Sequence, residues 1–240
     1  MVTEIRNNIL SKFDNLTFDE ASHTYYVEGK PLQSSVSKVI GNFYEKFNSK
    51  KIAKAISLRD GVPMQDILDD WDRIAKEACD IGHRVHLFGE HYPFDRSLKP
   101  SCNKEVAVTK FWNDIPEHII PVLMECRMYH KEYLFAGTAD ILLYDTKKNY
   151  YILGDYKTNK DLFKNYQNKT LKAPFDFLYD SPFNKYQIQL SLYQILLEQI
   201  GIYVGERKLI WLKDSGDYVM YDTEDLTEIL KPTLKEIYAS

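Results

Sequence analysis

Two aspartates and one lysine flank a short polar turn in the middle of the chain. Asp140 ends the sequence Gly-Thr-Ala-Asp, and Asp155 and Lys157 end the next apolar run. The two runs have the length of strands, and the polar turn at 145–149 predicts a β-hairpin between them. In that hairpin Asp140 lies opposite residue 154 or 155, and Asp155 and Lys157 share one strand face. Two carboxylates beside an ammonium group can hold a hard divalent cation and position a water molecule.

The composition is that of a folded chain without overall positive charge. The 240 residues suffice for one large domain or two small ones, and 44% of them are hydrophobic. The formal net charge is −4, so any contact with nucleic acid must use a local patch. The segment from Lys147 to Lys172 has seven lysines, two aspartates and several interleaved tyrosines. We predict that Lys160, Lys164 and Lys169 follow a DNA strand, although a solvated loop would show the same composition.

The cysteines and the apolar runs exclude several other classes of protein. Cys79, Cys102 and Cys126 are scattered without a CxxC pair, which argues against a zinc ribbon, a four-cysteine iron–sulfur cluster and a disulfide framework. The N-terminal residues lack the apolar segment of a secretory signal, and no apolar run approaches the roughly 20 residues of a membrane helix. We therefore expect a soluble cytoplasmic protein with no membrane partner.

Hydrophobic periodicity predicts the elements that hold the charged residues. A small β-hairpin is expected within 12–33, followed by a helical region from a serine cap near Ser35 to about Leu58. Residues 60–63, Asp-Gly-Val-Pro, are expected to break the helical pattern. From Met64 to His91 apolar residues recur at steps of three and four, which predicts one long helix.

The second half of the chain predicts an antiparallel meander and a mixed sheet. Strands are expected at 119–129, 133–144, 150–157, 207–212 and 218–221, and helices at 104–113, 183–200 and 224–238. This order predicts an α/β fold with a mixed central sheet flanked by helices. Residues 1–60 are predicted to form an N-terminal extension of a β-hairpin and helices, and residues 61–240 the core domain.

Four short motifs occur in a recognisable order. They are Gly82-x-x-x-His86, Gly-Thr-Ala-Asp140, Asp155-Tyr156-Lys157 and Gln189-x-x-x-Tyr193. Over about residues 80–200 this pattern resembles the RecB-like branch of the PD-(D/E)xK nuclease superfamily. The segment 23–26, His-Thr-Tyr-Tyr, followed by Ser-Val-Ser at 35–37, is similar to the leader of phage RecB-like exonucleases and of mitochondrial genome maintenance exonucleases. The resemblance implies a restriction-endonuclease-like core, in a bacterium or a phage-infected cell.

The resemblance also implies a role for each matching residue. The implied ligands of one or two Mg²⁺ or Mn²⁺ ions are His86, Asp140, Asp155 and the carbonyl oxygen of Tyr156. Lys157 is implied to orient or activate the attacking water and to offset charge on the scissile phosphate. Glu125, on the preceding strand, matches a glutamate that is often part of such sites. Gln189 and Tyr193 are implied to contact DNA and brace the site. An iron–sulfur cluster is not implied, because its four cysteines are absent.

Each of these residues also has an ordinary structural interpretation. Asp155 and Lys157 alone would form a simple salt bridge, and His86 alone would more often be a core or surface histidine. The order and spacing of all four motifs favour a metal-dependent deoxyribonuclease. We expect an exonuclease that acts on single strands or duplex ends in recombination, repair or replication, with DNA as its partner and a recombinase, helicase or single-strand-binding protein as a further one. A structure-selective endonuclease and a catalytically silent DNA-binding subunit remain alternatives.

Overall fold

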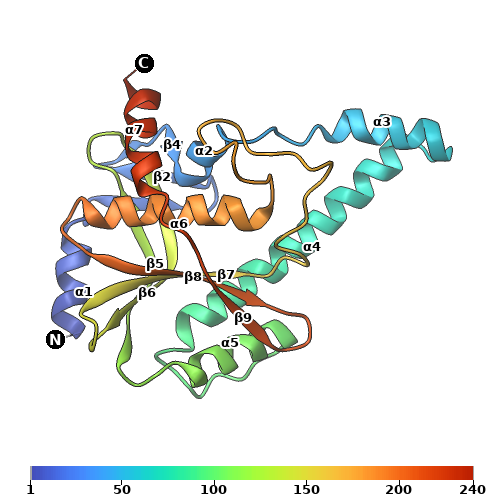
Figure 1. The fold of residues 1–240 in the computed structure, drawn as a ribbon. Helices are drawn as coiled ribbons and strands as arrows, with labels where there is room; N and C mark the ends of the chain where they lie inside the picture. The colour runs from blue at the N-terminus through green and yellow to red at the C-terminus, as the bar shows by residue number, and fades with distance from the viewer. Residues whose placement is uncertain (1, 240) are drawn as a thin grey trace.

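A computed structural model describes residues 2–239 and shows a central sheet covered by helices (Figure 1). The sheet has six strands in the order β4-β6-β7-β8-β9, and β5 also pairs with β6. Its strands are β4 (Ser34–Ser35), β5 (Ile119–Tyr129), β6 (Phe135–Asp145), β7 (Tyr150–Lys157), β8 (Val204–Leu212) and β9 (Tyr218–Asp222). A separate three-stranded sheet comprises β1 (Leu16–Asp19), β2 (Thr24–Val27) and β3 (Lys30–Pro31).

The described residues also form seven helices. They are α1 (Val2–Ser11), α2 (Val36–Ile40), α3 (Ser49–Asp60), α4 (Met64–His91), α5 (Asn103–Asp114), α6 (Pro182–Glu198) and α7 (Thr227–Tyr238). Strands β5, β6 and β7 pair antiparallel, whereas β4 with β6 and β7 with β8 pair parallel. The predicted α/β class, the mixed sheet and the antiparallel meander are therefore confirmed.

The central strands are apolar on both faces because each face carries helices. Leu142 and Leu153 pack in the cluster that contains α6, whereas Ile141 and Ile152 pack in the cluster that contains α5. Adjacent residues of a strand point to opposite faces, so this alternation follows from the pleat. Burial of each such side chain contributes roughly 1.5–3 kcal/mol to folding.

The helical region predicted to reach Leu58 is interrupted, and this is a correction. Helix α2 ends at Ile40, and residues 41–48 form an irregular connection before α3. The Phe43 carbonyl accepts a hydrogen bond from the backbone of Lys172 at 2.7 Å, and the Phe43 ring is buried. The Asn48 side chain then caps α3 by accepting a hydrogen bond from the Lys51 backbone at 3.0 Å. A buried anchor and a new cap thus separate the two helices.

Helices α3 and α4 form an arm that projects from the sheet (Figure 1). Gly61, with a φ of +70°, ends α3 in the left-handed conformation that glycine adopts without strain. Every residue from 72 to 81 of α4 is exposed, whereas Val85 and Gly89 are buried against the body. The arm is therefore anchored at the C-terminal end of α4, beside the predicted histidine.

The main hydrophobic core contains residues from before and after residue 60, where the sequence predicted a domain boundary. Ile9 and Val36 belong to the same buried cluster as Leu196 of α6. The boundary itself stays a prediction. Among residues 2–239, every helix is too short or too polar to cross a lipid bilayer.

Candidate active site

Strands β6 and β7 separate at Asp140, and the candidate site lies at this opening in the sheet. Strand β6 pairs with β7 from Ile141 to Asp145 and with β4 at Phe135 and Ala136. Between these two stretches, among the described residues, no strand pairs with that edge of β6. Ile141 lies opposite Gly154, so Asp140 comes next to Asp155, as the predicted hairpin required. The Asp140 Oδ2 atom accepts a hydrogen bond from the Tyr156 backbone at 2.8 Å, and this bond replaces the ladder where the strands separate.

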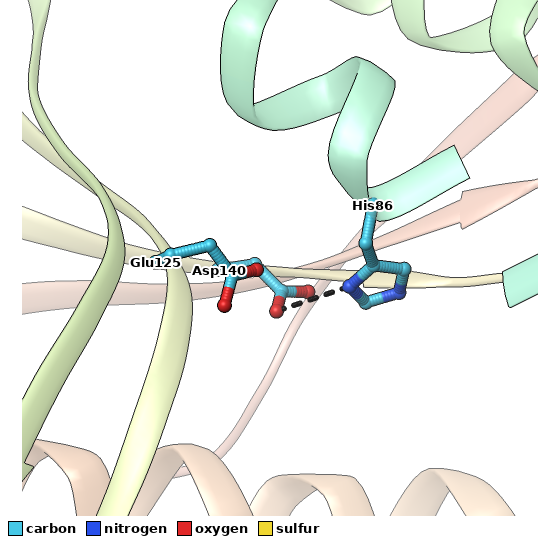
Figure 2. Close-up of side chains that lie close together, drawn as sticks. All are labelled: His86, Glu125 and Asp140. Atoms are coloured by element: carbon cyan, nitrogen blue, oxygen red, sulfur yellow. Dashed lines mark ion pairs between the residues drawn. The ribbon is translucent and has the colours of Figure 1, made fainter. Parts of the chain in front are cut away.

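Three side chains from three elements meet at this opening (Figure 2). His86 comes from α4, Glu125 from β5 and Asp140 from β6. Their potential ligand atoms all lie within 4.8 Å of one another. The Nδ1 atom of His86 is 3.2 Å from Oδ1 of Asp140. One nitrogen and two carboxylates are thus close enough to share a single cation.

Glu125 reaches this cluster through an unusual backbone conformation. Its φ is +49°, although it is not a glycine and lies within a strand. The β5–β6 ladder is regular at Met124 and at Cys126 but skips Glu125. A left-handed residue inside a strand costs roughly 1–3 kcal/mol and is found most often at functional sites. Figure 2 shows the result, with the Glu125 carboxylate beside that of Asp140.

The cluster holds more negative charge than its own cations offset. Burial, reinforced by the charge of Asp140, raises the pKa of Glu125 to about 7. The same two causes raise the pKa of Asp155 to about 6. Burial alone would lower the pKa of His86, but the Asp140 carboxylate raises it to about 9. Protons thus compete for positions at which a metal cation would also be stabilised.

Asp155 lies beside this trio and is bound to Lys157. The two side chains form an ion pair, and both are largely buried. The Asp155 Oδ2 atom is the one that faces the Lys157 amine, and this contact opposes the effect of burial on the pKa of Asp155. A buried carboxylate is costly unless it is paired, and the lysine supplies that partner.

Helix α6 holds Lys157 in place. The Lys157 Nζ atom donates to Gln189 Oε1 at 3.4 Å and lies 4.0 Å from the centre of the Tyr186 ring. Gln189 in turn donates to the Tyr193 hydroxyl at 2.7 Å. Tyr193 is buried beneath Gly137, where a Cβ atom would lie 2.7 Å from the tyrosine ring. Gln189 and Tyr193 therefore brace the lysine, and their predicted contact with DNA stays a prediction.

The three predicted groove lysines lie outside the cluster, on the loop between β7 and α6. Lys160, Lys164 and Lys169 are all exposed. Lys164 lies over the ring of Tyr166, and Lys169 forms an ion pair with Glu45 at 2.9 Å. The structure thus does not bring these three lysines together with the acidic residues of the candidate site.

Sequence reasoning missed three residues that shape the site. Glu90, one turn after His86 on α4, helps to raise the pKa of Glu125. Tyr186 contacts Lys157 as described above. Gly89 gives room to the Tyr156 ring, because a Cβ atom there would lie 2.5 Å from it. Helical spacing from His86 and Gln189 was the signal that could have identified Glu90 and Tyr186.

The Tyr156 side chain has a structural role. The Trp112 indole donates to its hydroxyl at 2.6 Å, and the ring packs edge-on at 6.0 Å from His86. Its side chain therefore ties β7 to α4 and α5. The predicted role of its carbonyl oxygen as a metal ligand stays a prediction.

Comparisons with known proteins leave the site to be interpreted from its own chemistry. No protein-family model matches the chain, and no curated protein matches it either.

The residues at the opening suit a divalent metal ion. They offer the imidazole nitrogen of His86 and the carboxylates of Glu125 and Asp140, with ligand atoms that all lie within 4.8 Å of one another. Oxygen ligands suit Mg²⁺ and Mn²⁺, and the imidazole favours Mn²⁺.

Proposed function

We propose that this chain is a metal-dependent nuclease that hydrolyses phosphodiester bonds in DNA, on a core of the PD-(D/E)xK type. One observation carries the proposal: His86, Glu125, Asp140 and Asp155 converge with a braced lysine where the central sheet opens. A purely structural ion pair would not require strained backbone at Glu125 or an excess of buried carboxylates.

The proposed ligands of the metal are His86, Glu125 and Asp140, with Asp155 at their side. Bound Mg²⁺ or Mn²⁺ supplies a Lewis acid that polarises the phosphate and lowers the pKa of a coordinated water. A bound cation would favour the charged forms of Glu125 and Asp155, against the burial and the neighbouring charge that raise their pKa values.

Lys157 contributes the positive charge that phosphodiester hydrolysis requires. Burial alone would lower its pKa, but Asp155 and Asp140 raise it, so the amine stays protonated. A protonated amine beside the scissile phosphate stabilises the negative charge that develops on the phosphate oxygens. Gln189 and Tyr186 limit the positions that this amine can adopt. The side chain is therefore held in position before the substrate arrives.

A nuclease assay with three DNA forms tests the proposal. The purified chain is incubated with Mg²⁺ or Mn²⁺ and with end-labelled linear single strands, linear duplex or covalently closed circles. Wild-type protein in EDTA and the Asp140→Ala variant are the controls. We expect cleavage of linear DNA by the wild type alone, with closed circles intact, as for an exonuclease.

The other outcomes choose among the alternatives. Nicked or linearised circles would indicate an endonuclease on the same site. Absence of cleavage with either metal, together with retained DNA binding, would contradict the catalytic proposal and favour a silent DNA-binding subunit.

A further inference from the structure

The segment at 46–59 carries a concentration of positive charge that the site does not use. It contains five cationic residues and no acidic one, although the whole chain has 35 acidic and 31 basic residues. The five are Lys46, Lys50, Lys51, Lys54 and Arg59. All are exposed, on α3 or just before it.

The lysines of this segment point away from the rest of the protein. Ala53 is the buried residue of α3, so it marks the inner face of the helix. Lys51 and Lys54 lie three residues apart on the face away from Ala53, and Lys50 lies at the edge of that face; all three are exposed. Leu58, which is 80% exposed, lies on that face too. The outer face of α3 is thus basic and open to solvent.

These lysines are not explained by pairing within the arm. The neighbouring segment of α4, residues 66–80, has six acidic and two basic residues. Even so, no ion pair joins α3 to α4 among residues 2–239, and Lys46, Lys50, Lys51 and Lys54 have no ion-pair partner there. Arg59, by contrast, is paired with Asp60. The four lysines are available to an external anion.

The arm connects this basic face directly to the candidate active site. The ring of Phe47, just before α3, lies 5.6 Å from that of Trp71 on α4. His86 follows fifteen residues later on the same helix. At about 1.5 Å per residue, the two positions are roughly 22 Å apart. In a duplex this distance spans about six or seven nucleotides, at about 3.4 Å per nucleotide of one strand.

We propose that the outer face of α3 binds the phosphate backbone of a nucleic acid, at a distance of several nucleotides from the cleavage site. The choice of nucleic acid rests on the proposed function. The charge pattern supports it, because unpaired lysines at helical spacing match a polyanion. A membrane surface fits less well, because α3 has only 12 residues and its inner face is occupied by α4.

The test measures DNA binding in EDTA, without cleavage. The variant Lys50→Gln/Lys51→Gln/Lys54→Gln is compared with Lys12→Gln/Lys30→Gln/Lys131→Gln. The control removes the same charge from three exposed lysines that also lack ion-pair partners. Fluorescence anisotropy is recorded at several salt concentrations with labelled DNA of about 5 and about 20 nucleotides. Phosphatidylserine vesicles serve as a second polyanion.

The α3 variant is expected to bind the longer DNA at least tenfold more weakly than the control variant does. The slope of log affinity against log salt should fall by about 2 to 3, or about one unit for each lysine. The short DNA, which cannot span the distance, should bind both variants equally. Equal behaviour of both variants on the long DNA, or a defect confined to vesicles, would overturn the inference.

These outcomes are independent of cleavage. A wild-type protein that fails to cut DNA but depends on α3 for binding would contradict the proposed catalysis and support the inference. A protein that cuts DNA but binds equally well without the three lysines would support the proposed catalysis and contradict the inference about α3.

Discussion

Strand β7 has a cluster of charges at each end, and the two clusters behave in opposite ways. At its start, Glu206 accepts hydrogen bonds from Tyr150 and Lys148 and pairs with Lys208. Burial alone would raise the pKa of Glu206, but these partners lower it to about 2. At the other end, the pKa of Glu125 rises to about 7 and that of Asp155 to about 6.

The difference shows what each cluster is suited to do. The Glu206 cluster satisfies its carboxylate from within the chain, so it stabilises the sheet. The Glu125 cluster gathers carboxylates with too few cations and places one of them in a strained conformation. Buried negative charge that the folded chain does not neutralise is typical of a binding site.

The largest expected effect separates two aspartates of β6, Asp140 in the middle of the strand and Asp145 at its end. Asp140→Asn should reduce cleavage by about a thousandfold or more and weaken Mn²⁺ binding, because it removes a central metal ligand. Asp145→Asn is the matched control, since Asp145 is also buried but accepts hydrogen bonds from the backbone amides of Lys147 and Lys148. We expect it to lower thermal stability and leave the specific activity of folded protein intact. Equal loss of activity in both variants would remove the distinction between the two aspartates.

Lys157→Gln should reduce kcat by about a hundredfold, as expected for a charge that stabilises the transition state. Mn²⁺ affinity, measured by isothermal titration calorimetry, should be unchanged or higher, because Asp155 loses its competing cation. The matching variant at the other end, Lys208→Gln, should lower the melting temperature without changing kcat. Loss of metal affinity in Lys157→Gln would argue that the lysine only maintains the fold.

Two glycines of α4 test how the arm positions His86. Gly89→Ala should weaken Mn²⁺ binding by about tenfold, because the new methyl group displaces the Tyr156 ring against which His86 packs. Gly82→Ala is the control, since its Cβ atom would meet nothing closer than 3.7 Å. Titration of both variants with Mn²⁺ checks this prediction, and equal affinities would contradict it.

The smallest expected effect is a pair of stability changes of opposite sign. Without metal, Glu125→Gln should stabilise the protein by about 1 kcal/mol, because it removes one of several like charges. Glu206→Gln should destabilise it by about 1 kcal/mol, through weaker hydrogen bonds to the lysines. Urea denaturation in EDTA at pH 7 measures both, and changes of the same sign would refute the contrast.

The contribution of Glu206 to the stability of the protein should also depend on pH in a defined direction. Its pKa is lowered on folding, so its stabilisation is complete above the unfolded pKa of about 4.5. It should be lost as the pH falls from about 4.5 to about 2. The difference in stability between wild type and Glu206→Gln, measured at a series of pH values, should shrink over that range.

The sequence predicted the regular elements well where the apolar pattern was long. The bounds of β5, β7 and α4 agree with the predicted ones. The hairpin register also placed Asp140 beside Asp155 correctly. These features follow from local periodicity and from the turn, which a single sequence contains.

Features set by distant contacts could not be predicted in this way. The left-handed conformation of Glu125 depends on its surroundings in the opened sheet, and no sequence pattern marks it. The interruption between α2 and α3 depends on Phe43 and its contact with a loop more than a hundred residues away. The ion pair of Lys169 with Glu45 is another contact of this kind. Tertiary contacts override local preference at such positions.

The exposed middle of α4 has a consequence for the order in which the protein comes apart. Amides at 72–81 are protected only by helical hydrogen bonds, whereas Asp140 lies on a strand inside the core. Hydrogen exchange should therefore be faster in the arm than in β6, since exposed helices open with less free energy. His86 lies in the anchored part of the same helix, between the buried residues Val85 and Gly89. On heating, the outer arm should therefore unfold while the histidine still lies beside the carboxylates.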